Sequence, residues 1–316
     1  MALVVLKFGG TSLANTKLMN NAVAKVIDEV SLGNKVIVVV SAIAGFTDHL
    51  VSLTNEITNC YNLDSSLEYA SVITAGEQIA AGLFTLLIQQ QGLKARSWLG
   101  WQSGIITDDN VLDSNIIELQ CDKIIKAFDD YQVAIVAGFQ GVTKNNRVST
   151  LGRGGSDTTA IILAGALKAS RCDIYTDVEG VFTADPRIVA KAQKLNYINY
   201  DEMIAFAYAG AKVLQAKSAE WAKYYKVNLR VLSSFTSSPG TLVNSSPPHY
   251  IAGIALSKES SLDMYKISII SSSPNDINLL KDCEDILKLN DINAFAIQTD
   301  AISGRKLSKR TIRKYL

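Results

Sequence analysis

The segment at residues 151–160 (LGRGGSDTTA) constrains the fold of this chain more than any other. Three glycines surround Arg153, and an apolar stretch of helix length begins near Thr158. Glycines let a backbone approach a ligand closely, and free N–H groups at a helix start attract an anion. Ser156 or Asp157 is a natural N-cap for that helix. We therefore predict an anion-binding turn here, with a plain glycine turn before a capped helix as the simpler alternative.

The N-terminal region supplies a second candidate phosphate site. Residues 3–8 (LVVLKF) and 35–40 (KVIVVV) have the pattern of buried strands, and residues 17–30 have helical apolar spacing. A strand, helix and strand in this order predict parallel strands of one sheet. Lys7 then lies at the carboxyl end of the first strand, where open α/β sheets bind ligands. The residues that follow it would let phosphates sit against the backbone: Gly9, Gly10, Thr11 and Ser12.

Hydroxyl and carboxylate groups add to this edge. Ser41 and Thr47 follow the second strand as candidate donors in a loop, and Glu77 lies in a helix expected over residues 71–90. That helix is otherwise apolar, so a buried Glu77 must be paired or face a ligand. The alternative is a partly exposed glutamate that the helix dipole stabilises.

The rest of the first 244 residues continues the α/β pattern. We expect further helices at residues 115–130, 200–209 and 211–225, and further strands at 132–138, 172–177 and 229–232, the last strand of this domain. Thr176 and Asp177 end the strand at 172–177, and Asp185 and Arg187 lie in a turn nearby. Carboxylates and an arginine at such a strand end suit nucleotide and phosphate contacts, although the same sequence is also a good plain turn. Lys212 is a second candidate lysine, at the junction of two expected helices.

The C-terminal region differs in pattern. Residues 245–249 (SSPPH) form the clearest linker. Beyond it we expect strands at 251–256, 264–270 and 293–298, a helix at 275–289, and a basic tail at 304–316 without further strand pattern. This order predicts a small α+β module. The chain therefore divides into domains at residues 1–244 and 245–316.

Composition excludes several classes of protein. The formal charge of +1 gives no reason to expect nucleic acid or an anionic membrane as partner. No stretch is predicted to span a membrane and no signal peptide is visible. Four cysteines without CxxC spacing favour reduced core thiols, so we expect a cytoplasmic protein. Two distant histidines make a structural metal site improbable.

Taken together, the charged candidates suit phosphoryl transfer, in which positioning and charge stabilisation supply most of the catalysis. Five ordered motifs resemble the aspartate kinases: KFGGTS at 7–12, TAGEQ at 74–78, GRGGSDTTA at 152–160, YTDVEGVFTADPR at 175–187 and GAKVL at 210–214. The resemblance covers essentially residues 2–244. It implies the amino-acid kinase fold, a three-layer αβα sandwich around a mainly parallel eight-stranded sheet.

The resemblance also implies an activity, the ATP-dependent phosphorylation of L-aspartate to 4-phospho-L-aspartate. This is the first step toward lysine, threonine and methionine, with Mg²⁺ carried by the nucleotide and no metal site of the protein itself. Lys7, Asp157 and Lys212 would be catalytic, and Ser41, Thr47, Glu77, Arg153 and Ser156 would bind the substrate. Lys7, Lys212, residues 9–12, Thr176, Asp177, Phe182, Asp185 and Arg187 would bind ATP. The family usually has tyrosine where this chain has Phe182, and His-Pro where it has Gln215-Ala216.

The C-terminal module resembles the start of the family's ACT-type regulatory region. The family carries two ACT domains, and this chain has room for barely one. We therefore expect weak or absent inhibition by lysine and threonine, and a homodimer or larger homo-oligomer formed through this module. Two alternatives stay open: another amino-acid kinase, such as an N-acetylglutamate or glutamate 5-kinase, or a catalytically inactive subunit that binds an amino acid.

Overall fold

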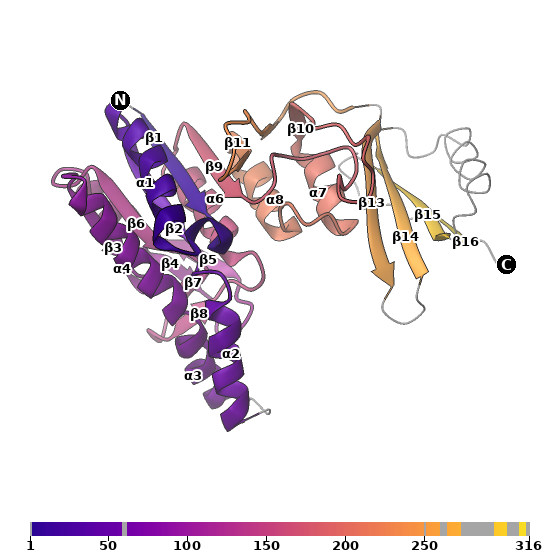
Figure 1. Cartoon of the computed structure of the whole chain (residues 1–316). Coiled ribbons are helices and arrows are strands. Elements are labelled where there is room, and N and C mark those ends of the chain that lie inside the picture. The colour runs from indigo at the N-terminus through magenta and orange to yellow at the C-terminus, as the bar shows by residue number, and fades with distance from the viewer. Residues whose placement is uncertain are drawn as a thin grey trace. The chain divides into compact units, whose positions relative to one another are not determined.

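The computed structural model describes residues 2–58, 62–249, 251–259, 264–272, 294–301 and 310–313 (Figure 1). The chain forms two compact units. The first comprises Met1–Glu179 and Tyr224–Pro239, and the second comprises Gly180–Lys223 and Gly240–Leu316. The domain boundary between residues 244 and 245 stays a prediction, because the two compact units are each built from two separate segments and do not correspond to the predicted domains.

A parallel sheet forms the centre of the first unit. Its six strands lie in the order β11-β9-β1-β2-β6-β3. Every pairing between neighbours in this set is parallel. The strands are β1 (Leu3–Phe8), β2 (Lys35–Val40), β3 (Ala95–Trp98), β6 (Val133–Ala137), β9 (Arg171–Thr176) and β11 (Leu229–Ser233). The complete strand order continues through β12 and β10, which confirms the eight-stranded, mainly parallel sheet.

The alternation of side chains along β1 determines what each face of the sheet carries. Val4, Leu6 and Phe8 are fully buried in an apolar cluster with α1 (Thr16–Ser31) and α4 (Ala75–Gln90). Successive side chains of a strand point to opposite faces, so Lys7 points to the other face. There α6 (Gly155–Ala166) packs against β1, β2 and β9. This alternation directs a lysine toward the helix that follows the glycine-rich turn.

The region between β2 and β3 is more helical than expected. The IAGFTD segment runs into α2 (Phe46–Ile57), which begins after Gly45 in the left-handed conformation, and α3 (Leu63–Ile73) follows. The predicted single helix at 71–90 is therefore wrong at its start, since α3 ends before Thr74 and α4 begins at Ala75.

One helical stretch of the described residues, Asp64–Gln90, is long and apolar enough to cross a membrane by length and composition alone. The sequence analysis predicts no stretch that spans a membrane. Half of its apolar window is buried inside the structure, and the core helix of a folded unit passes the same test. Phe84 and Ile88 are fully buried in the apolar cluster against the sheet, which explains the composition by packing.

A second, four-stranded sheet lies in the first unit in the order β5-β4-β7-β8. Its strands are β4 (Ile105–Thr107), β5 (Ile116–Leu119), β7 (Gln140–Thr143) and β8 (Val148–Thr150). The helix expected at 115–130 is therefore wrong. Ile116–Leu119 pairs with β4 instead, and only α5 (Asp122–Ala127) is helical there. Pairing with the preceding strand in the sequence overrode the local helical pattern.

The second unit begins after residue 179. It contains β10 (Tyr197–Asn199), which pairs in parallel with β12 (Thr241–Asn244), and α7 (Tyr200–Tyr208). We predicted that the strand at 229–232 is the last one before the linker. This prediction is wrong, because β12 follows it. The helix expected at 211–225 is shorter, because α8 covers Ala216–Tyr225, and Lys212 precedes it.

The C-terminal sheet has the order β13-β14-β15-β16, with strands at Ile251–Glu259, Met264–Ser271, Ala294–Ala301 and Arg310–Arg313. The first three confirm the predicted strands. The prediction of a tail without a strand is wrong, because β16 pairs antiparallel with β15. The helix predicted at 275–289 lies outside the described residues, as do Cys60 and Cys283. Cys121 and Cys172 are free, buried thiols, as expected.

Candidate active site

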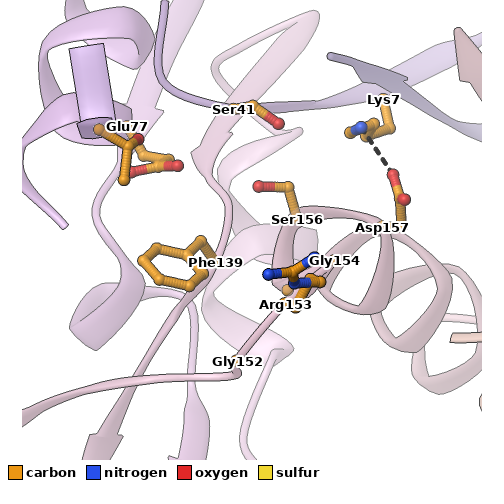
Figure 2. Close-up of a pocket in the computed structure, with 11 residues that line it drawn as sticks. Lys7, Ser41, Glu77, Phe139, Gly152, Arg153, Gly154, Ser156 and Asp157 are labelled. Carbon is orange, nitrogen blue, oxygen red and sulfur yellow. Dashed lines mark ion pairs between the residues drawn. The ribbon is translucent and has the colours of Figure 1, made fainter. Parts of the chain in front are cut away.

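A cavity of about 220 Å³ lies in the first unit, where the carboxyl ends of β1, β2 and β6 meet the first turn of α6 (Figure 2). It brings together side chains from distant parts of the sequence. Its lining comprises Lys7, Ser41, Thr47, Glu77, Phe139 and the run from Gly152 to Asp157. Seven of the predicted catalytic and substrate-binding residues therefore share one pocket.

Lys7 and Asp157 form an ion pair, in which Nζ lies 2.6 Å from Oδ1. Figure 2 marks this pair with a dashed line. Only 10% of the lysine side chain and 13% of the aspartate side chain are exposed. Water therefore screens the two charges little. Asp157 lies in the first turn of α6, where the helix dipole also stabilises a negative charge. This geometry holds the Lys7 ammonium at the cavity wall.

The glycine-rich turn has the conformation that its glycines permit. Gly152 and Gly154 have φ of 73° and 74°, in the left-handed region. A Cβ on Gly152 would lie 2.2 Å from Oδ1 of Asp113, which would have to move, and the positive φ also disfavours any larger residue there. Gly154 is the N-cap of α6. The prediction that Ser156 or Asp157 caps the helix is therefore wrong, since both lie within its first turn. In that place their side chains face the cavity.

Glu77 is a buried carboxylate with one unused oxygen. Its Oε1 accepts a hydrogen bond from the backbone N–H of Ala42 at 3.0 Å. Its Oε2 is buried and has no hydrogen-bond partner among the described residues. Burial raises the pKa of Glu77 from 4.5 to about 7, and the Ala42 N–H and Lys7 only partly oppose the shift. A buried carboxylate facing a cavity with a free oxygen is suited to a cationic ligand group.

Arg153 and the hydroxyls complete the wall. Arg153 is exposed at the turn and lines the cavity. Ser41 follows β2 directly, and Thr47 lies in the first turn of α2. The cavity thus offers two carboxylates, of which that of Asp157 is paired with Lys7, two cationic groups and three hydroxyls. Such a set suits a small zwitterion that carries a further carboxylate.

Phe139 is a lining residue that the sequence analysis missed. It follows β6 and has φ of 70°, a conformation that non-glycine residues rarely adopt. Its ring lies in the cavity between Glu77 and Arg153 (Figure 2). A left-handed phenylalanine leaves no local signal, because glycine and asparagine are the residues that usually mark this conformation.

Apart from Lys7, the predicted ATP-binding residues of the first unit lie outside the described lining of this cavity. Gly9 donates its N–H to the carbonyl of Tyr175 at 3.2 Å, and Gly10 packs closely against Ala42. Ser12 is buried, and its hydroxyl lies 2.5 Å from that of Ser234. Further along, Thr11 is exposed, and the Thr176 hydroxyl donates to the carboxylate of Asp177. These groups surround the tips of β1 and β9.

The remaining candidates belong to the second unit. Asp185 and Arg187 form an ion pair at 2.8 Å, and hydrogen bonds from Arg187 lower the pKa of Asp185. Phe182 forms an isolated antiparallel bridge with Lys194, and Lys212 is exposed. No group of three or more His, Cys, Asp or Glu side chains that could hold a metal ion occurs among the described residues.

The fold and the pocket together define a class of protein. The model of the amino acid kinase family matches residues 2–233, which cover the central sheet and every residue that lines the cavity. The chain therefore belongs to the amino acid kinase family.

Individual relatives narrow this further. The aspartokinase of Rickettsia conorii is 44% identical over 274 residues, which make up 86% of this chain and 68% of that relative. An aspartate kinase structure from Synechocystis has a TM-score of 0.69 and 38% identity, and covers 78% of this chain and 40% of its own. E. coli aspartokinase III in complex with aspartate and ADP has a TM-score of 0.71 and 26% identity, and covers 99% of this chain and 79% of its own. Within its family, this chain is an aspartate kinase.

Proposed function

We propose that this aspartate kinase binds L-aspartate in the cavity between Glu77 and the Lys7–Asp157 ion pair, and transfers the γ-phosphoryl group of ATP to its side-chain carboxylate. The observation that carries this proposal is that Glu77 and Lys7 face one small cavity from opposite sides (Figure 2). A buried carboxylate with a free oxygen lies on one side, and a buried lysine at a glycine-rich helix start lies on the other.

The substrate is oriented by its charges. The ammonium group of aspartate pairs with Glu77, whose free Oε2 lacks a partner among the described residues. Arg153 pairs with the α-carboxylate, since its planar guanidinium can donate two parallel hydrogen bonds. The hydroxyls of Ser41, Thr47 and Ser156 complete the contacts. This arrangement leaves the side-chain carboxylate directed toward Lys7.

The reaction needs no general base. An oxygen of the substrate's side-chain carboxylate attacks the γ-phosphorus, and the bond between that phosphorus and the β–γ bridging oxygen breaks. The products are 4-phospho-L-aspartate and ADP, and no proton is transferred. Lys7 and Lys212 stabilise the negative charge on the phosphoryl oxygens, and Asp157 holds the Lys7 ammonium in place. The positive end of the α6 dipole adds to this stabilisation.

ATP would bring Mg²⁺ with it, and the ion would add positive charge at the phosphates. Gly9, Gly10, Thr11 and Ser12 provide backbone and hydroxyl groups for the phosphates after β1. The other residues proposed to contact the nucleotide are Thr176, Asp177, Phe182, Asp185, Arg187 and Lys212. Phe182 offers an aromatic surface without the hydroxyl that its relatives usually have.

Two alternatives are disfavoured by specific observations. An N-acetylglutamate kinase binds an acylated amine, which carries no charge, so a buried carboxylate such as Glu77 would remain unpaired beside it. An inactive regulatory subunit would have no need for a lysine–aspartate pair at a helix start, and here that pair is intact.

The test is a steady-state assay of ADP release with L-aspartate, L-glutamate and N-acetyl-L-glutamate as alternative acceptors. We expect the highest kcat/KM with L-aspartate. Faster turnover of the acylated compound would refute the proposal, and so would ADP release that does not depend on any acceptor.

Three wider statements belong to the same proposal. The product enters the biosynthesis of amino acids derived from aspartate, and the protein works in the cytoplasm. The protein assembles at least as a dimer, because edge strands of a sheet tend to pair with another chain, and among the described residues β16 pairs with one strand only, β15. Light scattering of the purified protein measures its mass directly, and a monomer at micromolar concentration would contradict the last statement.

A further inference from the structure

Residues 138–140, Gly-Phe-Gln, follow β6 and have no assigned part in the reaction. Phe139 has the left-handed φ of 70° described above. A conformation of this kind is strained and persists only where its surroundings hold it. The contacts that hold it come from both ends of the cavity.

On the side of the phosphoryl group, Phe139 is tied to α6. The hydroxyl of Thr159, which is fully buried, accepts the N–H of Phe139 at 3.2 Å and donates to the carbonyl of Gly155 at 2.9 Å. The carbonyl of Phe139 accepts the N–H of Leu151 at 2.8 Å. A Cβ on Gly155 would lie 2.8 Å from the Phe139 ring, so this ring packs directly on the first helical turn. The anion-binding turn and Phe139 are therefore fixed relative to each other.

On the side of the substrate ammonium, Gln140 is tied to α4. Its amide is fully buried, donates to the carbonyl of Thr74 at 2.9 Å and accepts the N–H of Gly100 at 3.0 Å. Thr74 is the N-cap of α4, three residues before Glu77. Because both hydrogen-bonding atoms of the amide are used, the start of this helix is held by the residue that follows Phe139.

Gly138 closes the same set of contacts. Its N–H donates to the carbonyl of Val40 at 3.0 Å, next to Ser41. A Cβ on Gly138 would lie 2.8 Å from the Ser156 hydroxyl oxygen, so only glycine permits this approach. Three consecutive residues thus touch the segments that carry Ser41, Glu77 and Ser156.

We propose that residues 138–140 act as a positioning brace that sets the span between Glu77 and the first turn of α6, and thereby selects a four-carbon over a five-carbon amino dicarboxylate. The inference rests on the proposed function of this pocket. A substrate held at its ammonium end reaches the phosphoryl group only if the span matches its length. One additional methylene displaces the reacting carboxylate, and displacements of about 1 Å cost on the order of a hundredfold in rate.

The test uses Thr159, which holds the brace without lining the cavity. Thr159→Val keeps the shape and removes both hydrogen bonds, whereas Thr159→Ser keeps the hydroxyl. The matched control is Thr85→Val, since Thr85 is also a buried helical threonine and its hydroxyl donates to Ala81 in its own helix. The measured quantities are the ratio of kcat/KM for L-aspartate to that for L-glutamate, and the melting temperature.

We expect the ratio to fall by about tenfold or more in Thr159→Val, the order that one methylene is worth in a fitted pocket. It should stay within about twofold in Thr159→Ser and Thr85→Val. An unchanged ratio of kcat/KM values in Thr159→Val would overturn the proposed role of residues 138–140, even if the melting temperature of the variant were lower than that of the wild type. If Thr159→Val does not fold, Phe139→Leu decides: a fall in its ratio supports the brace and an unchanged ratio overturns it. A wild-type protein that prefers N-acetyl-L-glutamate would instead overturn the proposed function, and the brace with it.

Discussion

The buried carboxylate of Glu77 makes the stability of the protein depend on pH in a direction opposite to that of most carboxylates. Burial raises its pKa from 4.5 to about 7, so the folded protein binds a proton more tightly than the unfolded chain does. Stability from this group is therefore complete below pH 4.5 and is lost as the pH rises through 7. At 1.36 kcal/mol for each pH unit, the loss between pH 5 and pH 8 is about 2.5 kcal/mol.

Glu77→Gln isolates this effect, because the amide oxygen can still accept the Ala42 N–H and carries no charge. Without substrate, the variant should gain about 2.5 kcal/mol relative to the wild type between pH 5 and pH 8. Urea unfolding of both proteins at the two pH values measures this gain. The same difference between the proteins at both pH values would refute the argument, because it would show that Glu77 titrates alike in the folded and unfolded states.

Three further predictions concern the pocket and its scaffold. Lys7→Ala and Asp157→Ala should each lower kcat by on the order of 10²–10³ while KM for aspartate changes little, as initial-rate kinetics will show; near-normal turnover would reject their roles. N-acetyl-L-aspartate should have a kcat/KM roughly 10⁴-fold below that of L-aspartate, since it leaves Glu77 unpaired, and comparable rates would exclude an ammonium contact. Arg230 forms an ion pair with Asp173, whose carboxylate is fully buried, while the arginine is partly exposed. Arg230→Leu removes this partner of a buried charge and should lower the unfolding free energy by about 2 kcal/mol. Arg147→Leu, which removes an exposed pair with Glu68, should cost less than about 1 kcal/mol in the same urea titration, and equal costs would contradict the distinction.

Sequence reasoning found most of the pocket because its residues follow from topology. Lys7 and Ser41 lie at the carboxyl ends of adjacent parallel strands, and Asp157 lies at the start of a helix on the same sheet. Parallel strands bring such ends to one edge, so separate motifs converge without knowledge of distances. Glu77 was found for a different reason, since a carboxylate in an apolar helix requires a partner.

What sequence reasoning missed depends on contacts with other segments, which a local pattern does not show. The strand Ile116–Leu119 exists because β4 pairs with it, and its isolated pattern favoured a helix. The left-handed Phe139 is held by hydrogen bonds of its N–H to Thr159 and of its carbonyl to Leu151, and both partners belong to later segments. The observed N-cap of α6, Gly154, lies two residues before Ser156, the nearer of the two predicted caps. The left-handed conformation of Gly154 lets the helix begin at Gly155.

The most direct test of the account is to identify the bond that the enzyme makes. An acyl phosphate reacts with hydroxylamine to give a hydroxamate, and mass spectrometry distinguishes the side-chain product of aspartate from the α-product. With ATP, Mg²⁺ and L-aspartate, the wild-type protein should give the side-chain hydroxamate in proportion to ADP, and Asp157→Ala should give almost none. ADP release without hydroxamate, or hydroxamate at the α-carboxylate, would contradict the orientation that Glu77 and Arg153 are proposed to impose.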